Sequence, residues 1–265
     1  MGDRPRGLIP SMDPLDLLLI AFVGLVAGAI NTVAGGGTLI TLPVMIVLGL
    51  PPHVANGTNR IGVVVQSAVA SWQFHKEKAL DLRLAVRLIL PACIGAILGA
   101  NLSLDLDEAV FKKLVAVLMI LVLTVMLVRE LPTFKRRRAE RDEDARPTPL
   151  WIQISVFAAI GFYGGFLQAG VGFFLLAGLN LVSDLDLVKA NAIKVMLVFA
   201  YTALAIPVFV WHGQIDWLAG GALAAGSMLG GWLGTKMTVS WGPLFVRIIL
   251  LFVVLASSTH LLGLW

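Results

Sequence analysis

Repeated apolar runs of about 20 residues, the length of a membrane-spanning helix, constrain this chain more than any other feature. They lie near residues 15–34, 54–74, 84–103, 109–129, 150–168, 188–211, 217–237 and 242–263. Of the 265 residues, 58% are hydrophobic, and the mean hydropathy of +0.90 is far above that of an ordinary soluble domain. The chain is therefore predicted to be an all-α polytopic membrane protein.

Two shorter apolar stretches, 38–50 and 172–183, each follow a glycine cluster. At about 13 residues they are too short for an ordinary span, so we expect short or half-helices. Irregular backbone at membrane depth is tolerated only where it is buried in protein or lines a cavity. Matching broken segments in two halves of a chain indicate the binding site of a transporter.

The chain carries an internal repeat. A shift of 135 positions, which is the separation of Asn56 and Asn191, also lays the cluster at Gly35 over Gly170 and Gly37 over Gly172. The repeat predicts two homologous halves, each with four full spans and one short glycine-preceded helix. We expect a first membrane repeat at 15–129, a basic linker at 130–149 and a second membrane repeat at 150–265.

The linker determines the expected orientation. It contains a cluster of cations that the positive-inside rule places in the cytoplasm: Lys135, Arg136, Arg137, Arg138, Arg141 and Arg146. If both short helices cross the membrane, each half has five crossings, and the odd number makes the halves inverted repeats. If neither crosses, the halves are parallel. We favour the inverted arrangement.

Two cations lie inside apolar stretches, at nearly equivalent places in the two halves. Arg60 follows Asn59, and the shift lays Lys194 over Asn59. A charge within the hydrocarbon layer costs a few kcal/mol or more, so it is tolerated chiefly where it is paired or serves a pathway. The alternative is that each side chain snorkels to the interface. A duplicated membrane protein with a cation in each half is predicted first to transport anions.

Neutral donors accompany the two cations. Glycines permit close approach of backbone N–H groups, and a helix that begins after them presents the positive end of its dipole. A small oxyanion such as a carboxylate, sulfite or sulfonate would suit such donors. The candidate site residues are Arg60, Lys194, Asn56, Asn59, Thr38, Asn191, Gly35, Gly36, Gly37, Gly170 and Gly172. Helix packing, a plain turn, capping or hydrogen bonds between helices are the structural alternatives for the glycines and asparagines.

Other motifs restrict the function. Glycine pairs with GxxxG spacing, at 24 and 28, 95 and 99, and 230 and 234, predict close helix packing. The sequence has no carboxylate deep in a span, no P-loop, no metal-ligand cluster and no GxSxG or HExxH motif. We therefore expect no cofactor, no bound metal and no enzymatic activity. The net charge of +4 is concentrated in connections, which argues against nucleic-acid binding.

The stretch from Gly28 to Pro43, followed by Val54-Ala-Asn-Gly-Thr-Asn59, resembles the first half of the sulfite exporter TauE/SafE family. The segment from Gly161 to Gly172 and the pair Ala190-Asn191 resemble that family's degenerate second repeat. The resemblance implies a bacterial or archaeal inner-membrane permease for small sulfur-containing or organic anions, including sulfite, sulfonates and sulfoacetate-like compounds. In the second half Ala192-Ile193-Lys194 replaces Gly-Thr-Asn, so any site is expected to be asymmetric.

The predicted mechanism places the anion between the two halves, near both glycine clusters, with access alternating as one half moves against the other. The expected partners are a small anionic substrate and the lipid bilayer, and a homodimer is left open. Two alternatives are a cation or metal-ion carrier and a non-transporting membrane scaffold or assembly factor. Intramembrane positive charge opposes the first of these alternatives.

Overall fold

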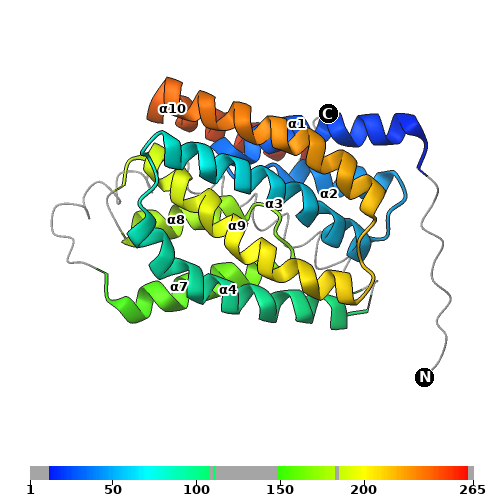
Figure 1. Ribbon diagram of the computed structural model, residues 1–265, viewed down its shortest axis with the longest axis horizontal. Coiled ribbons are helices and arrows are strands. Elements are labelled where there is room, and N and C mark those ends of the chain that lie inside the picture. Colours follow the sequence, from blue (N-terminus) through cyan, green and yellow to red (C-terminus); the bar gives the residue numbers. More distant parts are fainter. Residues whose placement is uncertain (1–11, 108–109, 111–147, 183–184, 262–265) are drawn as a thin grey trace.

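The computed structural model describes residues 12–107, 110, 148–182 and 185–261, and all regular secondary structure in these residues is helical (Figure 1). The predicted span at 109–129 and nearly all of the basic linker lie outside the described residues. The helices are α1 (Pro14–Val33), α2 (Thr38–Val47), α3 (Pro52–Lys76), α4 (Leu82–Asp105), α7 (Leu150–Phe166), α8 (Val171–Val182), α9 (Leu187–Trp211) and α10 (Trp217–Leu261).

The helix boundaries confirm most of the predicted segments. Three helices, α1, α4 and α9, are long and apolar enough to cross a membrane, and both short stretches are helices of 10 and 12 residues, α2 and α8. α3 and α9 each contain 25 residues, and their first residues, Pro52 and Leu187, are separated by the shift that relates the repeats. The internal repeat is therefore visible in the helix boundaries.

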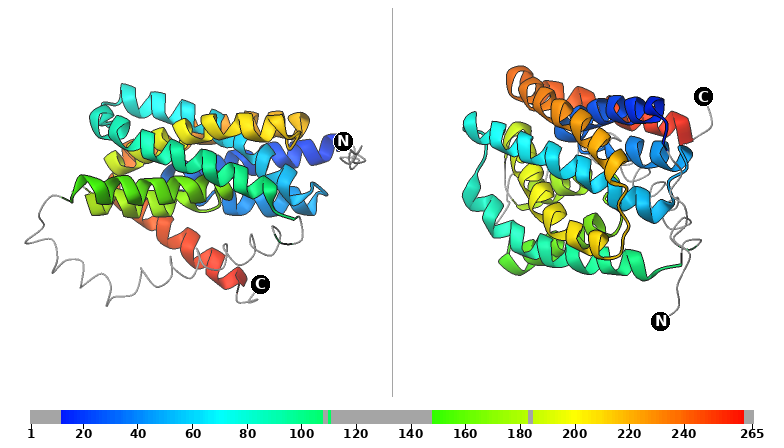
Figure 2. Two further views of the ribbon diagram at one scale, coloured as in Figure 1. Left: turned by 90° about the horizontal axis from the view of Figure 1, so that it is seen from below. Right: turned by 45° about the vertical axis from the view of Figure 1, so that its right-hand side comes forward.

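The last two predicted spans differ from the structure. The sequence predicts separate helices at 217–237 and 242–263, but α10 is one helix of 45 residues. A straight helix of this length would measure about 68 Å, more than twice the hydrocarbon thickness of a bilayer. Its orange N-terminal part and red C-terminal part run in different directions (Figure 2). Residues 238–241, which were expected to separate the two spans, are helical as well.

Aspartates at helix N-termini fix where several helices begin. The side chain of Asp81 accepts a hydrogen bond of 3.1 Å from the N–H of Leu84, at the start of α4. Asp186 accepts from the N–H groups of Val188 and Lys189 at 2.9 and 3.0 Å, at the start of α9. Each carboxylate satisfies N–H groups that the first helical turn leaves without partners, so these boundaries follow from local sequence.

The two halves exchange their fourth helices. α1 packs along α10, and α4 packs along α7, so each half's first helix pairs with the other half's fourth helix. In Figure 1, α1 and α10 form one edge of the molecule, α4 and α7 form the other, and α3 and α9 lie between them. We call α1, α2, α3 and α10 the first bundle, and α4, α7, α8 and α9 the second bundle.

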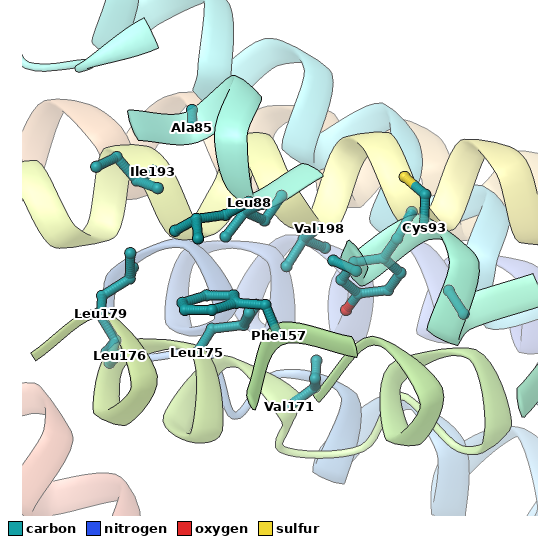
Figure 3. Close-up of a cluster of buried hydrophobic side chains, with 14 of the residues drawn as sticks. Ala85, Leu88, Cys93, Phe157, Val171, Leu175, Leu176, Leu179, Ile193 and Val198 are labelled. Atoms are coloured by element: carbon teal, nitrogen blue, oxygen red, sulfur yellow. The ribbon is translucent and has the colours of Figure 1, made fainter. Parts of the chain in front are cut away.

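Each bundle has an apolar core of its own. In the second bundle, Leu88 of α4, Phe157 of α7, Leu175 of α8 and Ile193 of α9 belong to one buried cluster (Figure 3). In the first bundle, another cluster joins α1, α2, α3 and α10 through Ile20, Met45, Val54, Ala55, Ala219 and Leu223. Two further clusters join the bundles, one around Leu42 and Phe166 and one around Phe74 and Val195.

Glycines bring the exchanged helices into backbone contact, as their spacing predicts. A Cβ added at Gly95 or Gly99 of α4 would lie 2.0 Å from a carbonyl oxygen of α7. Gly161 and Gly165 of α7 meet α4 carbonyls in the same way, at 2.1 and 1.9 Å. Such close approach is how small residues hold membrane helices together without a hydrophobic driving force. The GxxxG pairs are confirmed as packing positions.

This packing can be tested with two glycines of α10. A Cβ at Gly226 would lie 1.8 Å from the carbonyl oxygen of Ala21, whereas a Cβ at Gly221 meets nothing within 4 Å. We expect Gly226→Ala to destabilise the protein by about 1–3 kcal/mol, because α1 and α10 must separate. Gly221→Ala is the matched control and should match the parent. Thermal unfolding in detergent measures both, and equal stability of the two variants would contradict the packing.

Candidate functional site

The two glycine clusters meet where the bundles touch. A Cβ added at Gly35 would lie 2.4 Å from the Cα of Gly172, so neither position has room for a side chain. Gly35 and Gly170 both have positive φ, +91° and +69°, a conformation that favours glycine. Thr38 links the clusters, since its hydroxyl donates to the carbonyl of Gln168 and accepts from the N–H of Gly170, both at 3.2 Å.

Arg60 of α3 reaches across the interface to the end of α7. Its guanidinium donates to the carbonyl oxygens of Gly164, at 3.2 Å, and Gly165, and these residues lie in the last turn of α7. The ring of Phe209 lies 4.3 Å from the guanidinium carbon. Arg60 is fully buried within the protein, so its side chain does not snorkel to the membrane–water boundary.

Lys194 of α9 makes the reciprocal contact. Its ammonium donates to the carbonyls of Asn31 and Thr32, at 3.0 and 2.9 Å, in the last turn of α1. It also donates to the side-chain oxygen of Asn191 at 2.6 Å, and only 1% of the residue is exposed. Each half therefore supplies a cation to the end of the first helix of the other half.

The chemistry of these contacts follows from the interrupted helices. α1 and α7 end within the protein, where their last carbonyls lack helical partners and carry the negative end of the dipole. Charged donors satisfy such carbonyls better than neutral ones. Among the residues that the structure describes, neither cation has a carboxylate partner. Two uncompensated positive charges are thus buried at the contact between the bundles.

The N-terminal ends of α2 and α8 point to the same place. α2 begins directly after its glycine cluster, α8 begins within its own cluster at Val171, and the clusters touch at Gly35 and Gly172. The positive ends of two helix dipoles therefore lie near the two cations. In the described part of the chain, the backbone N–H groups of Gly36, Gly37 and Thr38 donate no hydrogen bond. This arrangement favours an anion.

A small polar cavity adjoins the beginning of α2. It offers about 10 Å³ to the centre of a water molecule, which corresponds to about one water. Its polar lining is Asn31, Thr38, Thr41, Asn59, Gln66 and Ser227, and Ala27, Gly28, Gly37 and Val63 complete it. All of these residues belong to the first bundle or to the turn before α2. We call this space the α2 cavity.

Side-chain hydrogen bonds hold the polar wall of the α2 cavity. Asn31 donates to Gln66 at 3.0 Å, and Gln66 donates to the hydroxyl of Thr32 at 3.0 Å. The hydroxyl of Thr41 donates to Oδ1 of Asn59 at 2.6 Å, which leaves Nδ2 of Asn59 as a buried donor without an acceptor. The wall is thus preorganised and retains one unused donor.

Unpaired polar atoms concentrate around this contact. Buried polar groups are nearly always hydrogen-bonded, so each exception requires an explanation. Three such atoms of the described residues lie at or beside the two buried cations: Asn59 Nδ2, Arg60 Nε and Asn191 Nδ2. Their gathering at one place is expected of a site that a ligand completes.

The structure brings most of the predicted site residues to this contact but gives them different surroundings. Thr38, Gly37 and Asn59 line the α2 cavity, whereas Asn56 donates to the carbonyl of Phe166 at 2.9 Å. Arg60 and Lys194 donate to carbonyls of α7 and α1, and Asn191 accepts from Lys194, so none of the three lines the cavity. The sequence analysis missed Asn31, Thr41, Gln66 and Ser227 as lining residues. Their signal was a polar side chain within an apolar span, which is uncommon without a function.

Comparison with known families identifies the group to which this arrangement belongs. The family model described as "Sulfite exporter TauE/SafE" matches residues 20–261. The chain belongs to the sulfite exporter TauE/SafE family. The match covers both glycine clusters and both buried cations, so the resemblance in the sequence is confirmed. Proteins of this family are membrane transporters, and this chain is a membrane protein.

Individual proteins that are similar to this chain are described as probable membrane transporters. A "Probable membrane transporter protein" of Haemophilus influenzae is 32% identical over 88% of this chain and 89% of the relative. The "Probable membrane transporter protein ORF9" of a Sinorhizobium species is 29% identical over 96% and 99%. The Escherichia coli protein YfcA, a "Probable membrane transporter protein", is 27% identical over 95% and 91%. No solved structure matches the chain.

Proposed function

We propose that this TauE/SafE protein is a permease for small sulfur-containing or organic anions, such as sulfite, sulfonates or sulfoacetate-like compounds. The observation that carries the proposal is electrostatic. Two buried cations and the N-terminal ends of two short helices converge where the bundles meet, with no described carboxylate to neutralise them. Such a centre attracts an anion and repels a cation.

The candidate residues divide into three roles. Gly37, Thr38 and Asn59 would contact the anion directly, because they line the α2 cavity. Arg60 and Lys194 would act through their charge, since most of their donors already bind carbonyls. The remaining candidates, Asn56, Asn191, Gly35, Gly36, Gly170 and Gly172, would hold the broken helices and the two cations in place.

Transport would proceed by alternating access, with the first bundle moving against the second. Hydrogen bonds from Thr38, Asn56, Arg60 and Lys194 cross the contact between bundles, so they would have to rearrange during the cycle. The halves would be inverted repeats, which gives the two bundles equivalent but opposite orientations. The protein would lie in the inner membrane with residues 130–149 in the cytoplasm, as a monomer or homodimer.

Flux measurements on purified protein in proteoliposomes test this proposal. We expect saturable uptake of at least one anion from a panel of sulfite, methanesulfonate, taurine, sulfoacetate and acetate. Empty liposomes are the control for leakage, and liposomes containing heat-denatured parent protein are the control for misfolded protein. Saturable flux of a metal cation in place of an anion would favour a cation carrier. Absence of any flux would favour a scaffold or assembly factor.

A further inference from the structure

Resting on the proposed function, we infer that the α2 cavity is where the anion binds. We infer further that it selects monovalent anions, such as methanesulfonate or acetate, over divalent ones, which include sulfoacetate and the doubly charged form of sulfite. The cavity lies within the first bundle and includes lining residues from α1, α2, α3 and α10. The second bundle contributes no lining residue, although its Gly170 binds the hydroxyl of Thr38 at the cavity edge. The binding place is therefore one-sided, in contrast to the shared arrangement of the cations.

The donors that face an anion here are neutral. The free N–H groups of Gly37 and Thr38 open the first turn of α2, and a helix N-terminus binds anions through such groups. Asn59 supplies an independent indication of a ligand, because it is 1% exposed and its Nδ2 has no acceptor. Its Oδ1 accepts from the hydroxyl of Thr41 at 2.6 Å, and Nδ2 is the donor left over.

Neutral donors favour an anion with one negative charge over an anion with two. The cost of removing an ion from water grows with the square of its charge, so a dianion costs about four times as much as a monoanion of the same size. The attraction of neutral dipoles grows only in proportion to the charge. The cavity is also small, with space for about one water-sized group. One oxygen atom of a small head group with a single negative charge, such as a carboxylate or sulfonate, fits both limits.

Binding measurements on the purified full-length protein test this inference. Calorimetric titration would compare methanesulfonate with sulfate, and formate with oxalate, in matched buffers. We expect each monoanion to bind at least tenfold more tightly than its divalent counterpart. A divalent anion that binds as tightly as its monovalent counterpart would overturn the selectivity.

Asn59→Asp tests the place of binding. The substitution keeps the size of the side chain and the acceptor for Thr41, but replaces the unused donor with a negative oxygen. We expect at least a tenfold loss of methanesulfonate affinity. Asn101→Asp is the matched control, because Asn101 is exposed on α4 and binds only the carbonyl of Ile97. If Asn59→Asp does not fold, Ser227→Ala removes the cavity hydroxyl, and a severalfold loss is expected.

The outcomes separate this inference from the proposed function. Unchanged affinity in the folded Asn59→Asp or Ser227→Ala protein, with anion binding in the parent, would place the anion elsewhere and leave the permease function standing. A parent protein that binds none of the four anions and transports none of the proteoliposome panel would overturn both. Anion transport without binding of these four would overturn the inference alone.

Discussion

Replacing Lys194 with methionine is expected to reduce anion transport about 50-fold or more. The Lys194 ammonium binds the carbonyl of Asn31, whose side chain lines the α2 cavity. At an effective dielectric constant of about 20, opposite unit charges several ångströms apart attract by a few kcal/mol, and about 2.4 kcal/mol corresponds to roughly 50-fold in the binding of a monoanion. Anion uptake into proteoliposomes measures the effect. Arg60→Met is expected to act in the same direction.

The effect of Lys194→Met on stability should be smaller than its effect on transport, because two contributions oppose each other. The variant loses three charge-assisted hydrogen bonds, each contributing about 1.5–3 kcal/mol. It also removes a buried charge whose desolvation costs several kcal/mol. Lys189→Met is the matched control, since Lys189 is an exposed cation on the same helix. Full transport by a folded Lys194→Met protein would show that this cation serves only to cap α1.

Separating the two halves is expected to abolish folding of each half. Chains cut within residues 130–149 would each lack a packing partner, because α1 requires α10 and α7 requires α4. Expressed alone, each half should aggregate or be degraded. Co-expressed, the halves should copurify in a one-to-one ratio and restore anion flux. A monodisperse, helical first half on its own would contradict the exchange of fourth helices.

Local features of the fold were predictable from the sequence. The short helices were expected because apolar stretches of limited length follow glycines, and α2 and α8 confirm them. Packing at Gly95 and Gly99 was expected because their spacing places them on one helix face, and α7 contacts both. The cations were recognised because a charge in an apolar span is costly. Each of these signals is contained within one helix.

The partners of these features were not predictable. Glycine spacing shows that α1 has a close neighbour but does not distinguish α10 from α4, since both carry glycines. The acceptors of Arg60 and Lys194 are backbone carbonyls, which every residue possesses and which leave no trace in the sequence. The α2 cavity requires Ser227 of α10 beside Asn31 of α1, a proximity created by the helix exchange. Which helices pack together, and which carbonyls accept from the two cations, therefore became known only from the structure.

The exchange of fourth helices has a consequence for how such a protein could arise by duplication. A single ancestral copy of the repeat would leave the glycine face of its first helix uncovered, and only the fourth helix of a second copy could cover it. That ancestor would have been an obligate, helix-swapped homodimer with two identical cations. After fusion of the two copies, their sequences would have been able to diverge. In the present chain the two cations differ in type and in position, since the shift lays Lys194 of α9 over Asn59 rather than over Arg60 of α3.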